Sequence, residues 1–255
     1  MLRYYISFLV LLRVAFGFAQ DQPIATQPID TQPKDTVIYK QSYGIRVGLD
    51  LSRILISSLD DNYTGLELVA DYRLTEDLYI AAELGTENKT QQEDLYNFNT
   101  SGSYLKAGVD RNTYANWYGE QNLIFYGGRL GFSTFSNTLN NYQIFDTNRY
   151  WNPEGFATAS ETPEEFNGLT AAWIEAVLGT KVELFPNVYL GASVRLGFLF
   201  TDAEDGRFPI LFVPGFNKVT WGSKFGLGYN YSISYFLPLY KKDKKVKKIE
   251  VETAE

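Results

Sequence analysis

The sequence predicts an all-β fold: an eight-stranded antiparallel up-and-down transmembrane β-barrel that follows an N-terminal signal peptide. Three observations predict it. Apolar residues recur at every second position from Tyr43 almost to the end of the chain, which is the period of a strand and not of a helix. The joins between the alternating stretches are mostly short at one end and long at the other, as in membrane barrels. The last alternating stretch is rich in aromatic residues, and a basic run follows it directly.

The N-terminus has the order of a secretory signal peptide. Arg3 precedes an apolar run from Tyr4 to Leu12, and small residues, Gly17 and Ala19, stand where a signal peptidase inspects the chain. We expect residues 1–19 to be removed; a retained anchor is the alternative. Residues 20–42 repeat Gln-Pro, which predicts an extended periplasmic linker.

Eight alternating stretches predict the strands. They lie at about residues 43–52, 63–74, 78–86, 103–111, 121–135, 169–184, 188–201 and 218–237, which places the barrel at 43–240.

The joins between these stretches predict an orientation. Those at 75–77 and 185–187 are tight, whereas those at 87–102, 136–168 and 202–217 are long. Every second join of a meander lies at the same end, so we expect the long joins to be extracellular loops and both termini to be periplasmic. Residues 241–255 then form a charged periplasmic tail.

The two faces of the strands differ in polarity. The polar face carries fourteen charges, seven of each sign: Arg46, Arg73, Lys106, Arg129, Lys181, Arg195 and Lys224 against Asp50, Glu67, Asp71, Glu83, Asp110, Glu175 and Glu183. A neutral set of this kind predicts pairing inside a narrow lumen, with the apolar face toward lipid. A lipocalin-like soluble binding barrel, with its apolar face inward, is the alternative.

Aromatic residues near the strand ends match the girdles of a membrane barrel. They are Tyr43, Tyr63, Tyr72, Phe132, Phe198, Phe200 and Tyr235. In the last strand, Lys224, Gly226, Tyr229 and Tyr231 fit the polar, glycine and aromatic pattern of an outer-membrane insertion signal. Over about residues 43–240, the chain resembles the small outer-membrane β-barrel proteins of Bacteroidota, including their families of unassigned function. The resemblance implies an integral outer-membrane location and no diagnostic catalytic motif.

The composition argues against an enzyme. The chain has no Cys and no His, so it offers no thiolate nucleophile, disulfide or serine-histidine chemistry. A pair of acids hydrolysing a glycoside is the one reaction class that stays open. We predict no catalytic, cofactor-binding or metal site, and the net charge of -7 argues against nucleic acid as a partner.

A barrel of this size has a lumen that side chains fill, and Tyr79 and Phe125 also point inward on this phasing. We therefore predict a plugged barrel and look to the loops for function. Two long loops carry apolar residues that either form a lid or dock a partner: Tyr150, Trp151, Phe156, Phe208, Ile210, Leu211, Phe212 and Val213.

These features predict an accessory or scaffold subunit of an envelope complex in the outer membrane. Its partners would be membrane lipid together with barrel-assembly machinery, export machinery or surface lipoproteins. A barrel that binds or transports a small molecule, a lipid or a glycan, is the alternative.

Overall fold

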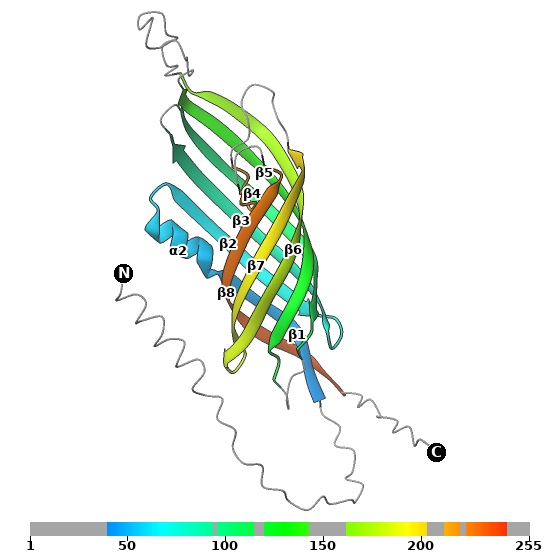
Figure 1. The fold of residues 1–255 in the computed structure, drawn as a ribbon. Helices are drawn as coiled ribbons and strands as arrows, with labels where there is room; N and C mark the ends of the chain where they lie inside the picture. Colours follow the sequence, from blue (N-terminus) through cyan, green and yellow to red (C-terminus); the bar gives the residue numbers. More distant parts are fainter. Residues whose placement is uncertain are drawn as a thin grey trace, which may run out of the picture. The chain divides into compact units, whose positions relative to one another are not determined.

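The computed structural model describes residues 40–93, 96–114, 120–142, 162–202, 212–219 and 223–243. Its eight strands form one closed barrel in chain order, which confirms the predicted all-β, eight-stranded up-and-down barrel (Figure 1). The strands are β1 (Lys40–Asp50), β2 (Tyr63–Arg73), β3 (Leu78–Gln92), β4 (Tyr96–Asn112), β5 (Leu123–Tyr142), β6 (Glu164–Phe185), β7 (Val188–Asp202) and β8 (Phe225–Asp243). Each strand pairs antiparallel with the next, and β8 closes on β1.

The barrel wall is apolar outside and charged inside. Along β5, Leu130 and Phe132 are 62% and 53% exposed, whereas Arg129 is 3% exposed. Successive residues of a strand point to opposite faces, so the same alternation runs around the wall. A lipocalin-like barrel would place its charges outside, and the observed faces are the reverse.

The outward face changes from apolar to polar along one row of paired residues. Thr86, Ser103, Thr134 and Thr170 pair in sequence across β3, β4, β5 and β6. The next outward row toward the termini is Leu84, Leu105, Phe132 and Ala172. We call the apolar zone on the terminal side of the Thr86 row the belt.

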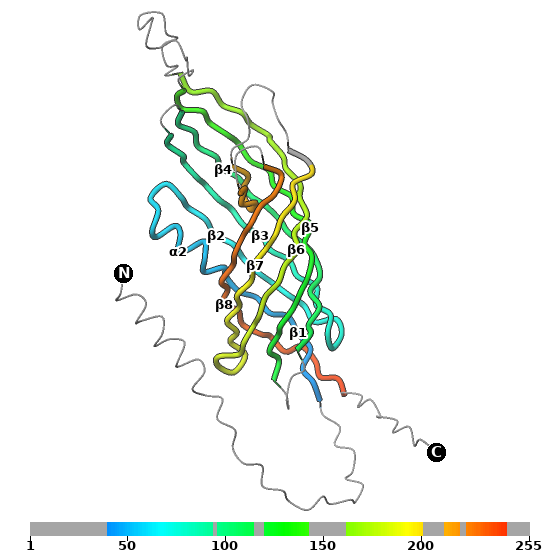
Figure 2. The backbone as a smooth tube through the Cα atoms, viewed as in Figure 1, coloured from blue at the N-terminus to red at the C-terminus, as the bar shows by residue number. Residues whose placement is uncertain are grey.

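Beyond the belt, β3 to β6 continue as a curved sheet (Figure 2). The polarity of its two faces is the reverse of that in the belt. Phe98 and Leu139 are now buried on the inner face, and Ser101 is exposed on the outer face. This reversal ends the apolar-outward pattern from which the strands were predicted. The predicted loops 87–102 and 136–168 were therefore too long, because residues 87–92, 96–102, 136–142 and 164–168 belong to strands.

The terminal end of the barrel also extends further than predicted. Lys40 pairs with Asp243 and Gln41 with Lys242. Residues 40–42 of the predicted linker and residues 241–243 of the predicted tail therefore belong to strands. A register shift between Tyr43 and Gly44 turns Tyr43 inward, where its ring stacks 5.5 Å from that of Tyr240. Tyr43 and Tyr63 are both 5% exposed and do not belong to an outer girdle.

A short helix, α2 (Leu51–Leu59), replaces the predicted end of the first strand. Asp50 caps it by accepting a hydrogen bond from the Ser52 amide at 2.7 Å, a favoured way to begin a helix. β1 pairs with β2 only as far as Leu49 and Leu68, and α2 covers the next part of β2, where Ser57 Oγ accepts from the Gly65 amide at 2.8 Å. Among the described residues, no helix is both long and apolar enough to cross a membrane.

Candidate functional site

A charged network occupies the inside of the barrel. Eleven of the fourteen charges predicted for the lumen are buried there, and Lys181 is partly buried. Glu183 is half-buried and accepts a hydrogen bond from the Asn187 amide at 2.8 Å in the β6–β7 turn. Lys224 is exposed just before β8 and does not join the network, so its predicted place in the lumen was wrong.

Two members of the network were missed by the sequence reasoning, Arg53 and Glu87, which are 7% and 1% exposed. Arg53 lies on the unpredicted helix α2, and Glu87 fell within a predicted loop. With these two, the charge network of the described residues comprises seven cations and seven carboxylates: Arg46, Arg53, Arg73, Lys106, Arg129, Lys181 and Arg195 against Asp50, Glu67, Asp71, Glu83, Glu87, Asp110 and Glu175. The two signs are balanced within this set.

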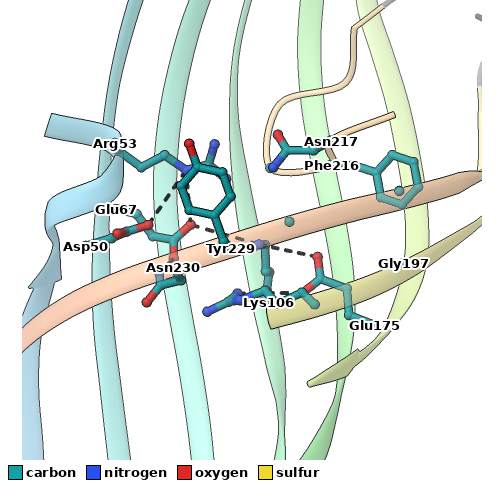
Figure 3. Close-up of a pocket in the computed structure, with 14 residues that line it drawn as sticks. Asp50, Arg53, Glu67, Lys106, Glu175, Gly197, Phe216, Asn217, Tyr229 and Asn230 are labelled. Atoms are coloured by element: carbon teal, nitrogen blue, oxygen red, sulfur yellow. Dashed lines mark hydrogen bonds and ion pairs between the residues drawn. The ribbon is translucent and has the colours of Figure 1, made fainter. Parts of the chain in front are cut away.

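Lys106 on β4 is the centre of the network (Figure 3). Its Nζ lies 3.3 Å from Glu175, 3.8 Å from Glu83 and 3.9 Å from Glu67. Arg195 on β7 contacts Glu83 and lies 3.6 Å from Glu175. Each cation therefore joins carboxylates from different strands, which ties opposite sides of the wall together.

Arg129 and Asp110 form the best-aligned pair. Two guanidinium nitrogens of Arg129 donate to the two carboxylate oxygens of Asp110 at 2.7 and 2.8 Å. Bidentate pairs of this geometry are among the strong charged contacts in proteins. This pair holds β4 and β5 in a single arrangement.

Asp71 anchors the terminal end of the network. It accepts from Arg46 Nε at 2.8 Å and from Lys181 Nζ at 2.5 Å. The Arg46 guanidinium also lies over the rings of Tyr79 and Tyr189, 5.0 and 5.1 Å from their centroids. Cation–π contacts of this kind compensate a buried guanidinium for lost hydration.

Glu87 joins three elements at the other end of the lumen. Its carboxylate lies 2.7 Å from Arg53 Nη1 and accepts from the Tyr63 hydroxyl and the Gly215 amide, each at 2.9 Å. Burial alone would lower the pKa of Arg53, but the carboxylates of Glu87 and Glu67 raise it well above its ordinary value. Arg53 therefore stays charged.

Residues 213–216 form a turn that plugs this end, which we call the plug turn. The Phe216 amide donates to the Val213 carbonyl at 3.0 Å, and Gly215 has φ +81°, as a type II turn with Pro and Gly at its centre requires. Val213 and Phe216 are 0% and 2% exposed. They pack in a core cluster with Tyr104, Phe135, Leu169, Ala171, Trp173 and Leu199.

The prediction of a partner-binding surface was wrong for two residues in or next to the plug turn. Val213 is fully buried, and Phe212 packs with Tyr63, Phe98 and Leu139. Both belong to the closure of the mouth and offer no docking surface. The other six predicted residues lie outside the described residues: Tyr150, Trp151, Phe156, Phe208, Ile210 and Leu211.

The free space beside the plug turn is small. The cavity drawn in Figure 3 measures about 20 Å³, enough for about one water molecule. Four buried polar atoms of its lining lack hydrogen-bond partners: Asp50 Oδ2, Arg53 Nε, Glu175 Oε2 and Arg195 Nε. Two donors and two acceptors around one such space suit a water molecule better than an ion of either sign.

A second cavity of about 30 Å³ shares Arg195 and Asn230 with the first. Neither cavity has room for an organic ligand. Within the described part of the chain, no group of acids has the arrangement of a metal site. The lumen can therefore brace the wall and exclude solutes.

The predicted insertion-signal residues lie at the start of β8. Tyr229 and Tyr231 are 54% and 50% exposed on the outer face, Gly226 packs against Phe216, and Lys224 is exposed. Their role in insertion stays a prediction.

A family model described as a domain of unknown function, DUF6048, matches residues 1–242 of the chain. The chain belongs to the DUF6048 family. No curated protein matches this DUF6048 chain significantly. Among solved structures it is similar to the crystal structure of Ail, the attachment invasion locus protein of Yersinia pestis, with 11% identity and a TM-score of 0.40 over 78% of this chain and 98% of that one. A likeness at this level carries no functional argument.

Proposed function

We propose that this DUF6048 protein is an integral outer-membrane barrel with a closed lumen, which acts without catalysis as an accessory or scaffold subunit of an envelope complex. The observation that carries the proposal is the belt of exposed apolar side chains around a barrel filled by a neutral charge network. In water such a belt would be a large aggregation-prone surface. In a bilayer it is the surface that lipid requires, and the ring is closed by the pairing of β8 with β1 over Lys40–Asp50.

The dimensions of the belt support a membrane location. On the outward face of β4, the apolar residues Leu105, Ala107 and Val109 are bounded by two polar residues, Ser103 at one end and Arg111 at the other. The eight steps from Ser103 to Arg111 cover about 27 Å at about 3.4 Å each. At a strand tilt of about 40° this is about 21 Å across the membrane, close to the apolar band of about 25 Å in membrane barrels.

The filled lumen argues against transport through the barrel. Ion pairs that involve five strands and α2 cross it, and its described cavities have room only for water. A lipid or glycan could therefore bind only at the mouth or on the outer wall. Contact surfaces outside the lumen are what the fold offers.

The part of β3 to β6 beyond the belt supports contact with other proteins. Its outer face is polar and its inner face is packed with aromatic residues, so it forms a folded surface outside the lipid. We place it on the extracellular side and both termini in the periplasm, because barrels of this class carry their short turns at the periplasmic end. Barrel-assembly machinery, export machinery or surface lipoproteins are the partners we propose.

Co-purification tests the scaffold role. Tagged protein is extracted from native outer membranes in several mild detergents, and accompanying proteins are quantified by mass spectrometry. We expect the same envelope proteins at near-equal stoichiometry in each detergent. A barrel that comes out alone every time would contradict the scaffold role.

Conductance in planar bilayers tests the closed lumen separately. We expect no steady channels from the wild-type protein at neutral pH, because charged side chains fill the path. Stable open channels would refute the plug while leaving the membrane location intact.

A further inference from the structure

We propose that a groove on the outer wall, at the terminal edge of the belt, binds the headgroup of a zwitterionic phospholipid that carries a phosphate and a primary amine. The proposal rests on the membrane location argued above. It adds a lipid site, with its ligand class, to a barrel whose lumen has no room for one.

The first observation is the position of Arg111. It follows Leu105, Ala107 and Val109 on the outward face of β4 and is exposed. In the register it lies between Leu78 of β3 and Tyr126 of β5. A cation at this point stands where the belt ends, which is the depth of lipid phosphates.

The second observation is a groove at the same place. It has a volume of about 450 Å³ and is lined by Asp77, Arg111, Asn112, Thr113, Tyr114 and Tyr126. The groove is far larger than either cavity of the lumen.

Two lining residues build the wall of the groove. Asn112 Oδ1 accepts from the amides of Tyr114 and Ile124 at 3.1 and 3.2 Å. Thr113 Oγ1 donates to the Ile124 carbonyl at 2.8 Å. Their polar atoms are thus used in holding the β4–β5 connection in shape.

The two charged groups of the lining make no ion pair with any described residue. Among the described residues, neither Arg111 nor Asp77 makes an ion pair, either with the other or with a third residue. The exposed rings of Tyr114 and Tyr126 stand beside them. The groove therefore offers a guanidinium, a carboxylate and phenol groups to a ligand.

A zwitterionic headgroup satisfies both charges at once. A guanidinium binds phosphate oxygens with two parallel hydrogen bonds, and a carboxylate pairs with an ammonium group. The acyl chains would then lie along the apolar outward side chains on the belt side of Arg111, beginning with Val109 of β4 and Leu130 of β5. An anionic lipid without an amine would leave Asp77 facing its negative charge.

Native mass spectrometry of the full chain, released from mixed phosphatidylethanolamine and phosphatidylglycerol bilayers, tests the site. We expect at least one retained phosphatidylethanolamine per barrel and little phosphatidylglycerol. Arg111→Gln should lower this retention about tenfold or more, because the lipid phosphate then loses its charged hydrogen-bond donor. Asp77→Asn should abolish the preference between the two lipids while keeping part of the retention.

Glu76→Gln and Lys40→Gln are the matched controls, because both side chains are exposed at the same end and neither lines the groove. Both should retain lipid as the wild type does. Soluble phosphoethanolamine, added as competitor, separates binding of the headgroup alone from binding of the whole lipid.

Equal retention of both lipids by the wild type, or no loss in Arg111→Gln, would overturn the lipid site. Displacement of the lipid by millimolar soluble phosphoethanolamine would overturn the role of the acyl chains and leave a headgroup site. A chain that fails to insert into bilayers would refute the proposed membrane location instead, so the two failures are distinguishable.

Discussion

At the scale of single residues, Glu87 has the most demanding position in the lumen. It is 1% exposed and its carboxylate binds Arg53, Tyr63 and the Gly215 amide, which belong to three separate elements. Removing one partner of a buried pair leaves the other charge without compensation. The desolvation cost of burying this carboxylate is therefore offset only while all three contacts are intact.

We expect Glu87→Gln to lower the free energy of unfolding by about 3 kcal/mol, because Arg53 then lacks its nearest carboxylate. Urea unfolding of the reconstituted barrel, followed by Trp fluorescence, measures the change. Glu93→Gln, an exposed change just after the same strand, should stay within about 0.5 kcal/mol. Equal effects of the two would show that Glu87 does not carry the contact.

At the scale of elements, the plug turn and α2 complete a wall that strands alone leave unfinished. α2 covers the edge of β2 beyond Gly65, and the plug turn packs against Tyr104 beneath the mouth. Gly215 makes the close approach possible, because a Cβ there would collide with the Tyr104 ring. The backbone at Gly215 also has a positive φ that other residues rarely adopt.

The matched pair Gly215→Ala and Gly168→Ala separates the two constraints. Gly168 has φ +74°, but nothing lies within 4 Å of a Cβ added there. Gly168→Ala should therefore lower the free energy of unfolding only through backbone strain, by about 1–2 kcal/mol. Gly215→Ala should cost about 1–3 kcal/mol more and speed hydrogen exchange of the amides in the plug turn. Equal stabilities and unchanged exchange would mean that the turn does not pack on Tyr104.

At the scale of the whole molecule, the belt decides which solvent the barrel needs. Leu130 lies on the outward face of β5 within the belt, and Thr134 lies on the same face at its polar edge. In a bilayer these positions differ in depth. In water they would be equivalent exposed sites.

We therefore expect Leu130→Arg to destabilise the barrel in lipid vesicles by about 2–4 kcal/mol, and Thr134→Arg by about 0–1 kcal/mol. Equilibrium unfolding from vesicles measures both. A soluble barrel would give the opposite order, since Leu130→Arg would remove an exposed apolar side chain.

The amino-acid sequence by itself determined the fold class, the number of strands and which face carries the charges. The reason is local: inside the belt, one face of every strand is exposed and apolar and the other meets the lumen, so each strand repeats the same period of two. Residues such as Arg129 and Glu175 could be placed inward from that pattern alone, and both are buried.

Only the tertiary structure decided the outer half of the molecule. Beyond Thr86 and Ser103 the apolar face turns inward and the pattern that marked the strands is lost, as the proposed change of solvent from lipid to water would require. Glu87 and Arg53 joined the network because strand pairing and α2 bring them within 2.7 Å of each other. The groove at Arg111 likewise depends on register, which sets an arginine of β4 beside Tyr126 of β5.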